Sequence, residues 1–126
     1  MICIAAAGAI MALAADQFTL RWTHSVTRTT WEERWQADPE GLHPVEAFVV
    51  GPGAGVEIPD HARRVSDGWR FSVDLPPQKQ VFLAASGATD GGWTLCAGAI
   101  CHELGRSASE PLRLWQAGDC SDPIAE

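Results

Sequence analysis

Basic residues are scarce in this sequence. Nine lysines and arginines stand against sixteen aspartates and glutamates among 126 residues, so the formal net charge is −7 and the pI is near 4.9. Nucleic acids and anionic membrane surfaces recruit proteins through clustered positive charge, and we therefore expect neither as a partner. Any contact with a membrane is expected only through a protein partner.

Tyrosine is absent, whereas tryptophan occurs six times. The hydrophobic fraction is 46% and the charged fraction is 20%, which is ordinary for a folded chain. A chain of this length supports one domain with one modest core. The tryptophans give that core unusually large apolar side chains.

Charge is also missing from the first fifteen residues, which are apolar or small. They are too few for a helix that spans a bilayer, which needs about 20 residues. The end of this segment, Ala12-Leu13-Ala14-Ala15, resembles a small-residue cleavage site, although no lysine or arginine precedes Arg21. We expect a removable signal peptide at 1–15, a single β domain at 16–126 and a periplasmic or otherwise exported protein. An ordered N-terminal helix is the alternative.

Removal of residues 1–15 would leave three cysteines, and export would allow a pair of them to oxidise. Cys96 and Cys101 flank a four-residue turn, so a Cys96–Cys101 disulfide is the first choice and a bridge from Cys120 to either is the second. A zinc site made of these three cysteines and His102 has poor spacing. We therefore expect no metal and no cofactor.

Helical periodicity is lacking as well. From Phe18 onward apolar residues recur with a period of two, which is typical of half-buried strands. The sequence predicts an all-β fold, a single-domain antiparallel β-sandwich or small barrel of about seven short strands. These strands are expected at residues 18–26, 31–36, 42–50, 69–75, 80–86, 93–96 and 100–104.

The most distinctive stretch is a predicted hairpin over residues 18–36. One apolar face of each arm carries an ionisable residue, His24 on the first and Glu33 on the second. Only a loop with an even number of residues keeps both apolar faces together. A four-residue loop at 27–30 would place His24 opposite Glu33, and Trp22 opposite Trp35.

A third residue, Glu46, joins this pair if it lies on the same face of the next predicted strand as Leu42 and Phe48. Pro44 in that strand predicts a sheet edge or a β-bulge. The set of His24, Glu33 and Glu46 then has two interpretations that the sequence leaves open. It is either a buried polar network that fixes strand register, or a site for a small ligand or cation.

No catalytic constellation accompanies these residues. Ser25 follows His24 directly, and neighbours on a strand point to opposite faces. The sequence has no Gly-x-Ser-x-Gly elbow for a serine nucleophile. The glycine-rich loop around Gly53 and Gly55 lacks the context of a nucleotide- or phosphate-binding loop. We therefore expect no enzymatic reaction.

Four stretches together resemble the domain of unknown function 1850 family over residues 18 to about 101. They are Trp22-Thr23-His24-Ser25-Val26, Trp31-x-Glu33-x-Trp35, Leu42-x-x-x-Glu46 and Gly53-Ala54-Gly55; Val56 departs from the methionine more often found after the glycines. Members are small exported bacterial proteins, often encoded beside permeases of TAXI-type tripartite (TRAP) transporters.

The resemblance implies an exported accessory protein with a binding or interaction role toward a TRAP-type permease or its solute-binding protein. It implies no reaction. The candidate ligand-binding residues are then His24, Ser25, Glu33, Glu46, Gly53 and Gly55. The alternative function is a β-barrel that binds a small ligand or cation through its inward histidine and glutamates.

Overall fold

The computed structural model describes residues 1–6, 8–23, 30–50, 59–65, 68–84, 92–105 and 111–120. Within these ranges the chain forms strands, and no helix there is long and apolar enough to cross a membrane. The described strands are β1 (Ile2–Ala6), β2 (Ala9–Leu13), β3 (Gln17–Thr23), β4 (Thr30–Asp38), β5 (Gly41–Val50), β6 (Arg63–Val65), β7 (Gly68–Ser72), β8 (Gln80–Leu83), β9 (Trp93–Ala97), β10 (Ile100–Leu104) and β11 (Leu112–Gln116).

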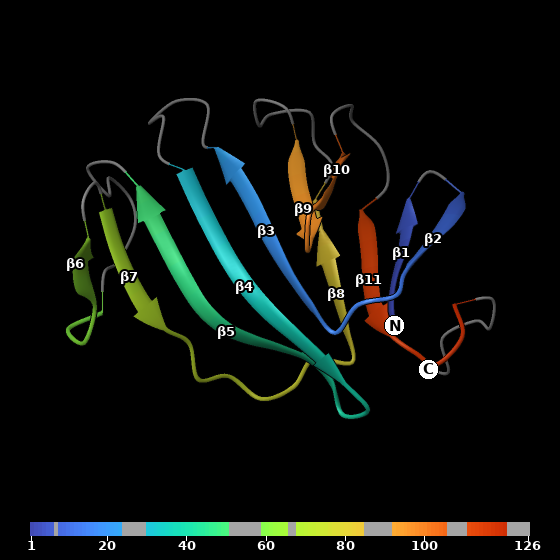
Figure 1. Ribbon diagram of the computed structural model, residues 1–126, viewed down its shortest axis with the longest axis horizontal. Helices are drawn as coiled ribbons and strands as arrows, with labels where there is room; N and C mark the ends of the chain where they lie inside the picture. The colour runs from blue at the N-terminus through green and yellow to red at the C-terminus, as the bar shows by residue number, and fades with distance from the viewer. Residues whose placement is uncertain are drawn as a thin grey trace.

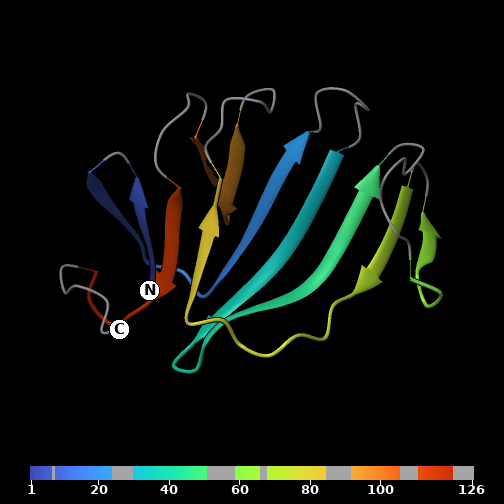
Figure 2. The ribbon, with the colours of Figure 1, turned by 180° about the vertical axis from the view of Figure 1, so that it is seen from behind.

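The strands form two antiparallel sheets (Figures 1 and 2). The smaller has four strands in the order β2-β1-β11-β8, and the larger has seven in the order β10-β9-β3-β4-β5-β7-β6. The predicted all-β class is confirmed, and the arrangement is sandwich-like rather than a closed barrel. The strand count exceeds the predicted seven, because residues 1–15 and two short segments, Arg63–Val65 and Leu112–Gln116, also pair into the sheets.

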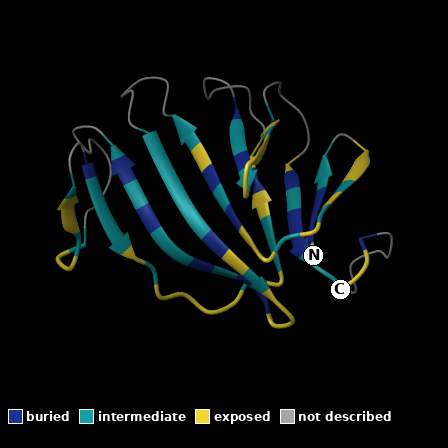
Figure 3. Cartoon of the chain, viewed as in Figure 1, coloured by how far each residue is buried: buried dark blue, intermediate teal, exposed yellow. Residues whose placement is uncertain are grey.

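The core lies between the two sheets and is built from alternate residues of the facing strands. Buried residues concentrate in β1 and β11, while β2 and β6 at the sheet edges are mostly exposed (Figure 3). Each fully buried leucine or isoleucine contributes about 1.5–3 kcal/mol through removal of apolar surface from water. The core residues are Ile2, Ile4, Phe18, Leu20, Trp35, Leu42, Leu83, Leu95, Leu104, Leu112 and Leu114.

Near the N-terminus, Ile2–Ala6 and Ala9–Leu13 pair as the antiparallel strands β1 and β2, so the alternative of an ordered N-terminal helix is wrong. β1 lies between β2 and β11, and its Ile2, Cys3 and Ile4 are at most 1% exposed. Cys3 is joined to Cys120 by a disulfide. The removal of residues 1–15 as a signal peptide stays a prediction. In this fold it would delete two strands and leave Cys120 without its partner.

The predicted Cys96–Cys101 disulfide is present, and it links directly opposite residues of β9 and β10. The second choice, a bridge from Cys120 to one of these two, is wrong because Cys120 pairs with Cys3. All four cysteines are therefore oxidised in pairs, which is compatible with an exported protein.

The hairpin β3–β4 exists as predicted, but its register differs. Trp22 faces Trp31 rather than Trp35, and Glu33 faces Leu20 rather than His24. Thr23 and Thr30 are the last pair that the structure describes, and six residues lie between them, whereas the predicted loop has four. The observed register places Arg21 opposite Glu32, with an Nη2–Oε1 distance of 2.9 Å. The predicted register would have left Arg21 opposite the uncharged Gln36.

A β-bulge in β5 is the second feature that repositions the site. Arg34 pairs with Glu46 and the next residue, Trp35, pairs with Pro44, so Val45 is the extra residue. The bulge that Pro44 predicted is therefore confirmed. An inserted residue exchanges the faces on its two sides. Glu46 thus points away from the core, on the face opposite to that of Leu42.

Candidate functional site

Of the six predicted site residues, four (His24, Ser25, Gly53 and Gly55) lie outside the described part of the chain. The other two, Glu33 and Glu46, are described, and the structure does not bring them together. They lie on opposite faces of the larger sheet, because of the bulge in β5. The sequence predicted His24, Glu33 and Glu46 on one face of the sheet, and this prediction is wrong for Glu46.

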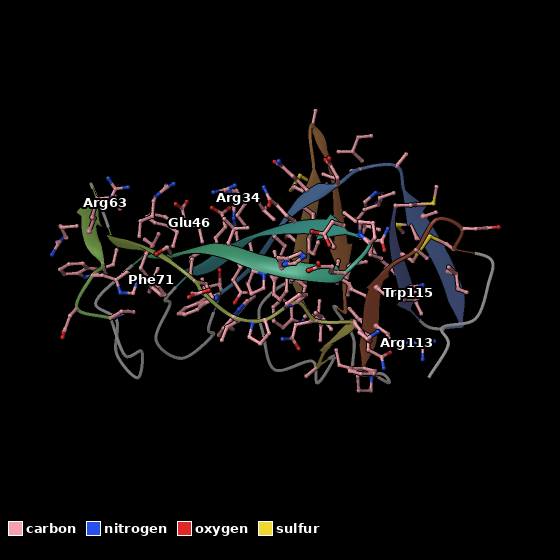
Figure 4. All side chains as sticks on the ribbon, turned by 90° about the horizontal axis from the view of Figure 1, so that it is seen from below. Arg34, Glu46, Arg63, Phe71, Arg113 and Trp115 are labelled. Atoms are coloured by element: carbon pink, nitrogen blue, oxygen red, sulfur yellow. A yellow bond between two sulfur atoms is a disulfide. The ribbon has the colours of Figure 1, made fainter. Side chains whose placement is uncertain are left out.

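Glu46 belongs to a charged outer face of the larger sheet. Its Oε1 accepts a hydrogen bond from Arg70 Nη1 at 3.0 Å, and Arg70 in turn lies over the ring of Phe48. Figure 4 shows Glu46, Arg34 and Arg63 on one side of the sheet and Phe71 on the other. Glu46 therefore takes part in a surface ion pair.

Glu33 lies on the inner face of β4, between Leu20 of β3 and Ala47 of β5. Trp35, two residues along the same strand, is 7% exposed and donates its Nε1–H to Glu33 Oε1 at 3.2 Å. A buried indole N–H needs an acceptor, so this hydrogen bond satisfies Trp35 and orients the carboxylate. Glu33 is thus a positioned acidic group on the inner face.

Half-buried aromatic side chains surround Glu33 on this inner face. The strand register places them together, since Trp22 pairs with Trp31, and Val49 pairs with both Trp31 and Trp69. The Trp22 and Trp93 rings are 5.8 Å apart, and Trp31 meets Phe71 edge-on at 6.2 Å. We call this set the aromatic face; it consists of Trp22, Trp31, Trp69, Phe71 and Trp93, all of intermediate exposure.

The aromatic face extends beyond the area that the smaller sheet covers. The larger sheet contributes core residues from β9, β10, the beginning of β3 and the hairpin end of β4 and β5. Contacts between the two sheets join β5 with β8 and β11. The strands β7 and β6 lie at the far side of the molecule from the smaller sheet in both ribbon views (Figures 1 and 2). This face continues from the core: Trp93 packs against it and donates its Nε1–H to the carbonyl oxygen of Ala84 at 3.0 Å, and Val49, between Trp31 and Trp69, is 0% exposed.

Two ionisable side chains border the aromatic face at its β6 end. The Arg64 guanidinium lies 5.4 Å from the centre of the Trp69 ring, a cation–π distance. The His61 ring meets Phe71 edge-on at 6.4 Å, and its Nε2 is 3.1 Å from the carbonyl oxygen of Ser72. Indole rings at such a surface can stack on flat, apolar or cationic groups.

A second polar cluster lies at the β4–β5 turn, and sequence reasoning missed it. His43 Nε2 is 2.8 Å from Asp38 Oδ2, and an oxygen of Glu40 completes a group of possible ligand atoms within 4.8 Å. The hydrogen bond from His43 is the main cause that lowers the pKa of Asp38. The sequence signal for this cluster was the turn-forming run Asp38-Pro39-Glu40-Gly41 with His43 two residues beyond it. Asp38 and Glu40 are exposed, and Asp38 Oδ1 accepts the backbone N–H of Glu40 at 2.8 Å, so the cluster serves to fix the hairpin.

The comparisons with known proteins return one result. A family model described as Domain of unknown function (DUF1850) matches residues 18–104, which is more than half of the chain and runs from β3 to β10. No curated protein and no solved structure matches the chain.

Proposed function

Because the chain belongs to the DUF1850 family, we propose that it is an exported accessory protein of a TAXI-type TRAP solute transporter. Its role is to bind the permease or the solute-binding protein in the periplasm, without a reaction of its own. The transporter association rests on the family resemblance given above. The two disulfides, Cys3–Cys120 and Cys96–Cys101, support export to an oxidising compartment.

The observation that carries the binding role is the aromatic face. Four tryptophans remain half-buried there, although each could bury 150–250 Å² in a closed core. Tryptophan is also the residue type that most often carries binding energy in protein interfaces. These points favour a surface that is covered by a partner.

The chemistry of the same face favours binding over catalysis. Glu33 is its one central ionisable group, and it is hydrogen-bonded to Trp35. Among the described residues, the hydrogen-bond partner of Glu33 is the Trp35 indole, and the other acid or base at this face, His61, lies at the β6 end with its Nε2 3.1 Å from the carbonyl oxygen of Ser72. A reaction would require such a partner group at hydrogen-bonding distance.

The test is co-purification from crosslinked, solubilised membranes of cells that also produce the neighbouring permease and solute-binding protein. We expect recovery of at least one of the two, and we expect Trp31→Ala to weaken capture about 30-fold or more, as for a tryptophan hot spot. Arg34→Ala, on the opposite face of the same strand, is the control and should leave capture unchanged.

The folded state of both variants is checked by thermal unfolding before the comparison. Absence of both transporter proteins from the crosslinked material would overturn the proposal. Equal capture by the wild-type protein and the Trp31→Ala variant would separate the association from the aromatic face, and would refute the binding surface proposed for it.

A further inference from the structure

The outer face of the smaller sheet, on the other side of the core, carries an open hollow of about 660 Å³. This volume lies within the range of small-molecule sites, about 300–1,000 Å³. Arg113 supplies the one charged side chain among the described residues that line it. The lining residues are Ala5, Ala6, Gly8, Ala9, Ile10, Phe82, Pro111 and Arg113.

Four of these residues form a continuous row across the sheet. Ile10 of β2 pairs with Ala5 of β1, Ala5 pairs with Arg113 of β11, and Arg113 pairs with Phe82 of β8. Phe82 is 58% exposed and Ile10 is 55% exposed. The hollow therefore has apolar walls at both ends and a guanidinium between them.

Arg113 is held in place by the residue two positions along its strand. Its guanidinium lies 5.3 Å from the centre of the Trp115 ring, and Trp115 is 3% exposed and therefore fixed. Figure 4 labels both side chains on β11. A stacked guanidinium keeps its N–H groups available in the plane of the fork, where they suit a carboxylate.

No carboxylate in the described part of the chain forms an ion pair with Arg113. Two other arginines on the outer strand faces, Arg21 and Arg70, are paired with Glu32 and Glu46. A guanidinium on an apolar wall interacts more strongly with an anion than one in open water does, since nearby apolar groups displace solvent. Arg113 thus combines fixed orientation, an apolar setting and an open anion-binding edge.

We propose that this hollow binds an apolar monocarboxylate, with its carboxylate on Arg113 and its hydrocarbon chain along Phe82 or Ile10. A single cation matches a single negative charge, and the net charge of −7 disfavours ligands with more. The alanines and Gly8 leave space for the chain, because they present no side chains beyond a methyl group. The site is separate from the aromatic face and does not depend on its function. Five of its eight described lining residues belong to β1, the β1–β2 turn and β2, so it exists only in a chain that retains residues 1–15.

Calorimetric titration of the full chain with octanoate, butanoate and octanol, all below micelle formation, tests the site. We expect saturable octanoate binding, weaker butanoate binding by up to about fourfold for each methylene removed, and much weaker octanol binding. Arg113→Gln should weaken octanoate binding by at least about tenfold and leave octanol unchanged, because only the charge-assisted hydrogen bond is lost.

Two further variants make the result specific. Arg63→Gln removes an exposed cation from the larger sheet and should not change octanoate binding. Phe82→Ala should weaken octanoate more than butanoate, because it shortens the apolar wall. Equal affinities for octanoate and butanoate, an equal loss in the Arg113 and Arg63 variants, or no binding at all would each overturn the proposal.

Discussion

The disulfide between Cys3 and Cys120 joins the first strand to the described C-terminal end of the chain. Its removal should destabilise the fold more than removal of the Cys96–Cys101 disulfide. We consider the double substitution Cys3→Ala with Cys120→Ala. We choose alanine rather than serine because both cysteines are at most 4% exposed, and a serine would bury a hydroxyl group there. The matched control is Cys96→Ala with Cys101→Ala, which removes the other disulfide.

The two losses can be worked out from the loops that the cross-links close. The sequence separations are 117 residues for Cys3–Cys120 and 5 residues for Cys96–Cys101. In the chain-entropy model, removal of the long cross-link lowers the free energy of unfolding by about 4.9 kcal/mol and removal of the short one by about 2 kcal/mol. The cavity left at Cys3 acts in the same direction.

Urea unfolding of the two variants and the wild-type protein measures these differences. With a slope of about 2 kcal/mol per molar urea, the midpoint should fall by about 2.4 M for the long cross-link and about 1 M for the short one. An equal or smaller loss in the Cys3 variant would refute the structural role of the first strand.

Peptide mapping without reduction provides an independent check on protein collected from the cell envelope. The fold predicts recovery of a peptide pair linked through Cys3 and Cys120. A mature protein that begins at Asp16 would instead support removal of residues 1–15, and β1 and β2 would then be absent from the functional molecule.

Two further predictions concern the larger sheet. Gly68→Ala should lower the free energy of unfolding by about 1–3 kcal/mol or more, because the added Cβ would collide with the backbone carbonyl of Val49, whereas Gly118→Ala has open space and should change it by less than about 0.5 kcal/mol. The lowered pKa of Asp38 implies a stabilisation that is complete above the unfolded carboxyl pKa, about 3.9, and fades as the pH falls through the folded value. Asp38→Asn removes the negative charge that strengthens the hydrogen bond from His43, so its urea midpoint should lie below that of the wild-type protein at pH 7 and approach it near pH 2. A difference that stays constant with pH would contradict this.

The period of two in the sequence was sufficient to predict strands and their buried faces, but it could not fix the register of β3 against β4. Registers that differ by two residues on each strand keep the same apolar faces together. The choice among them falls to individual cross-strand pairs, here Arg21 with Glu32 and the hydroxyl contact of Thr23 with Thr30 at 3.3 Å. The predicted partner of Glu33 was therefore the least secure part of the site.

The position of Glu46 shows a different limit. Both faces of β5 carry apolar residues, so the pattern alone does not tell which one is buried. The bulge at Val45 follows from Pro44, which cannot donate a hydrogen bond to the ladder. The sequence indicated the bulge but not which residue would be the extra one, and that detail decides the face on which Glu46 lies.

The composition of the N-terminal segment did not predict the hairpin β1–β2. An uncharged run of alanine, isoleucine and leucine fits both the apolar region of a signal peptide and a buried strand, so composition cannot separate them. The number of cysteines bears on the choice without deciding it: four can form two pairs, whereas removal of Cys3 leaves an odd thiol. The observed Cys3–Cys120 bridge agrees with the even count.

The unequal size of the two sheets explains why the tryptophans bear on function. A four-stranded sheet cannot cover the whole inner face of a seven-stranded one. Side chains on the rest of that face must therefore be either polar or covered in some other way. The outer face of the same strands is solvated by charged pairs, such as Arg21 with Glu32 and Arg70 with Glu46. Among the described residues, the part of the inner face that extends beyond the smaller sheet instead carries large aromatic rings and one carboxylate. Solubility alone would favour charged side chains on both faces of these strands. The aromatic residues therefore favour contact with a partner or ligand over a purely structural role.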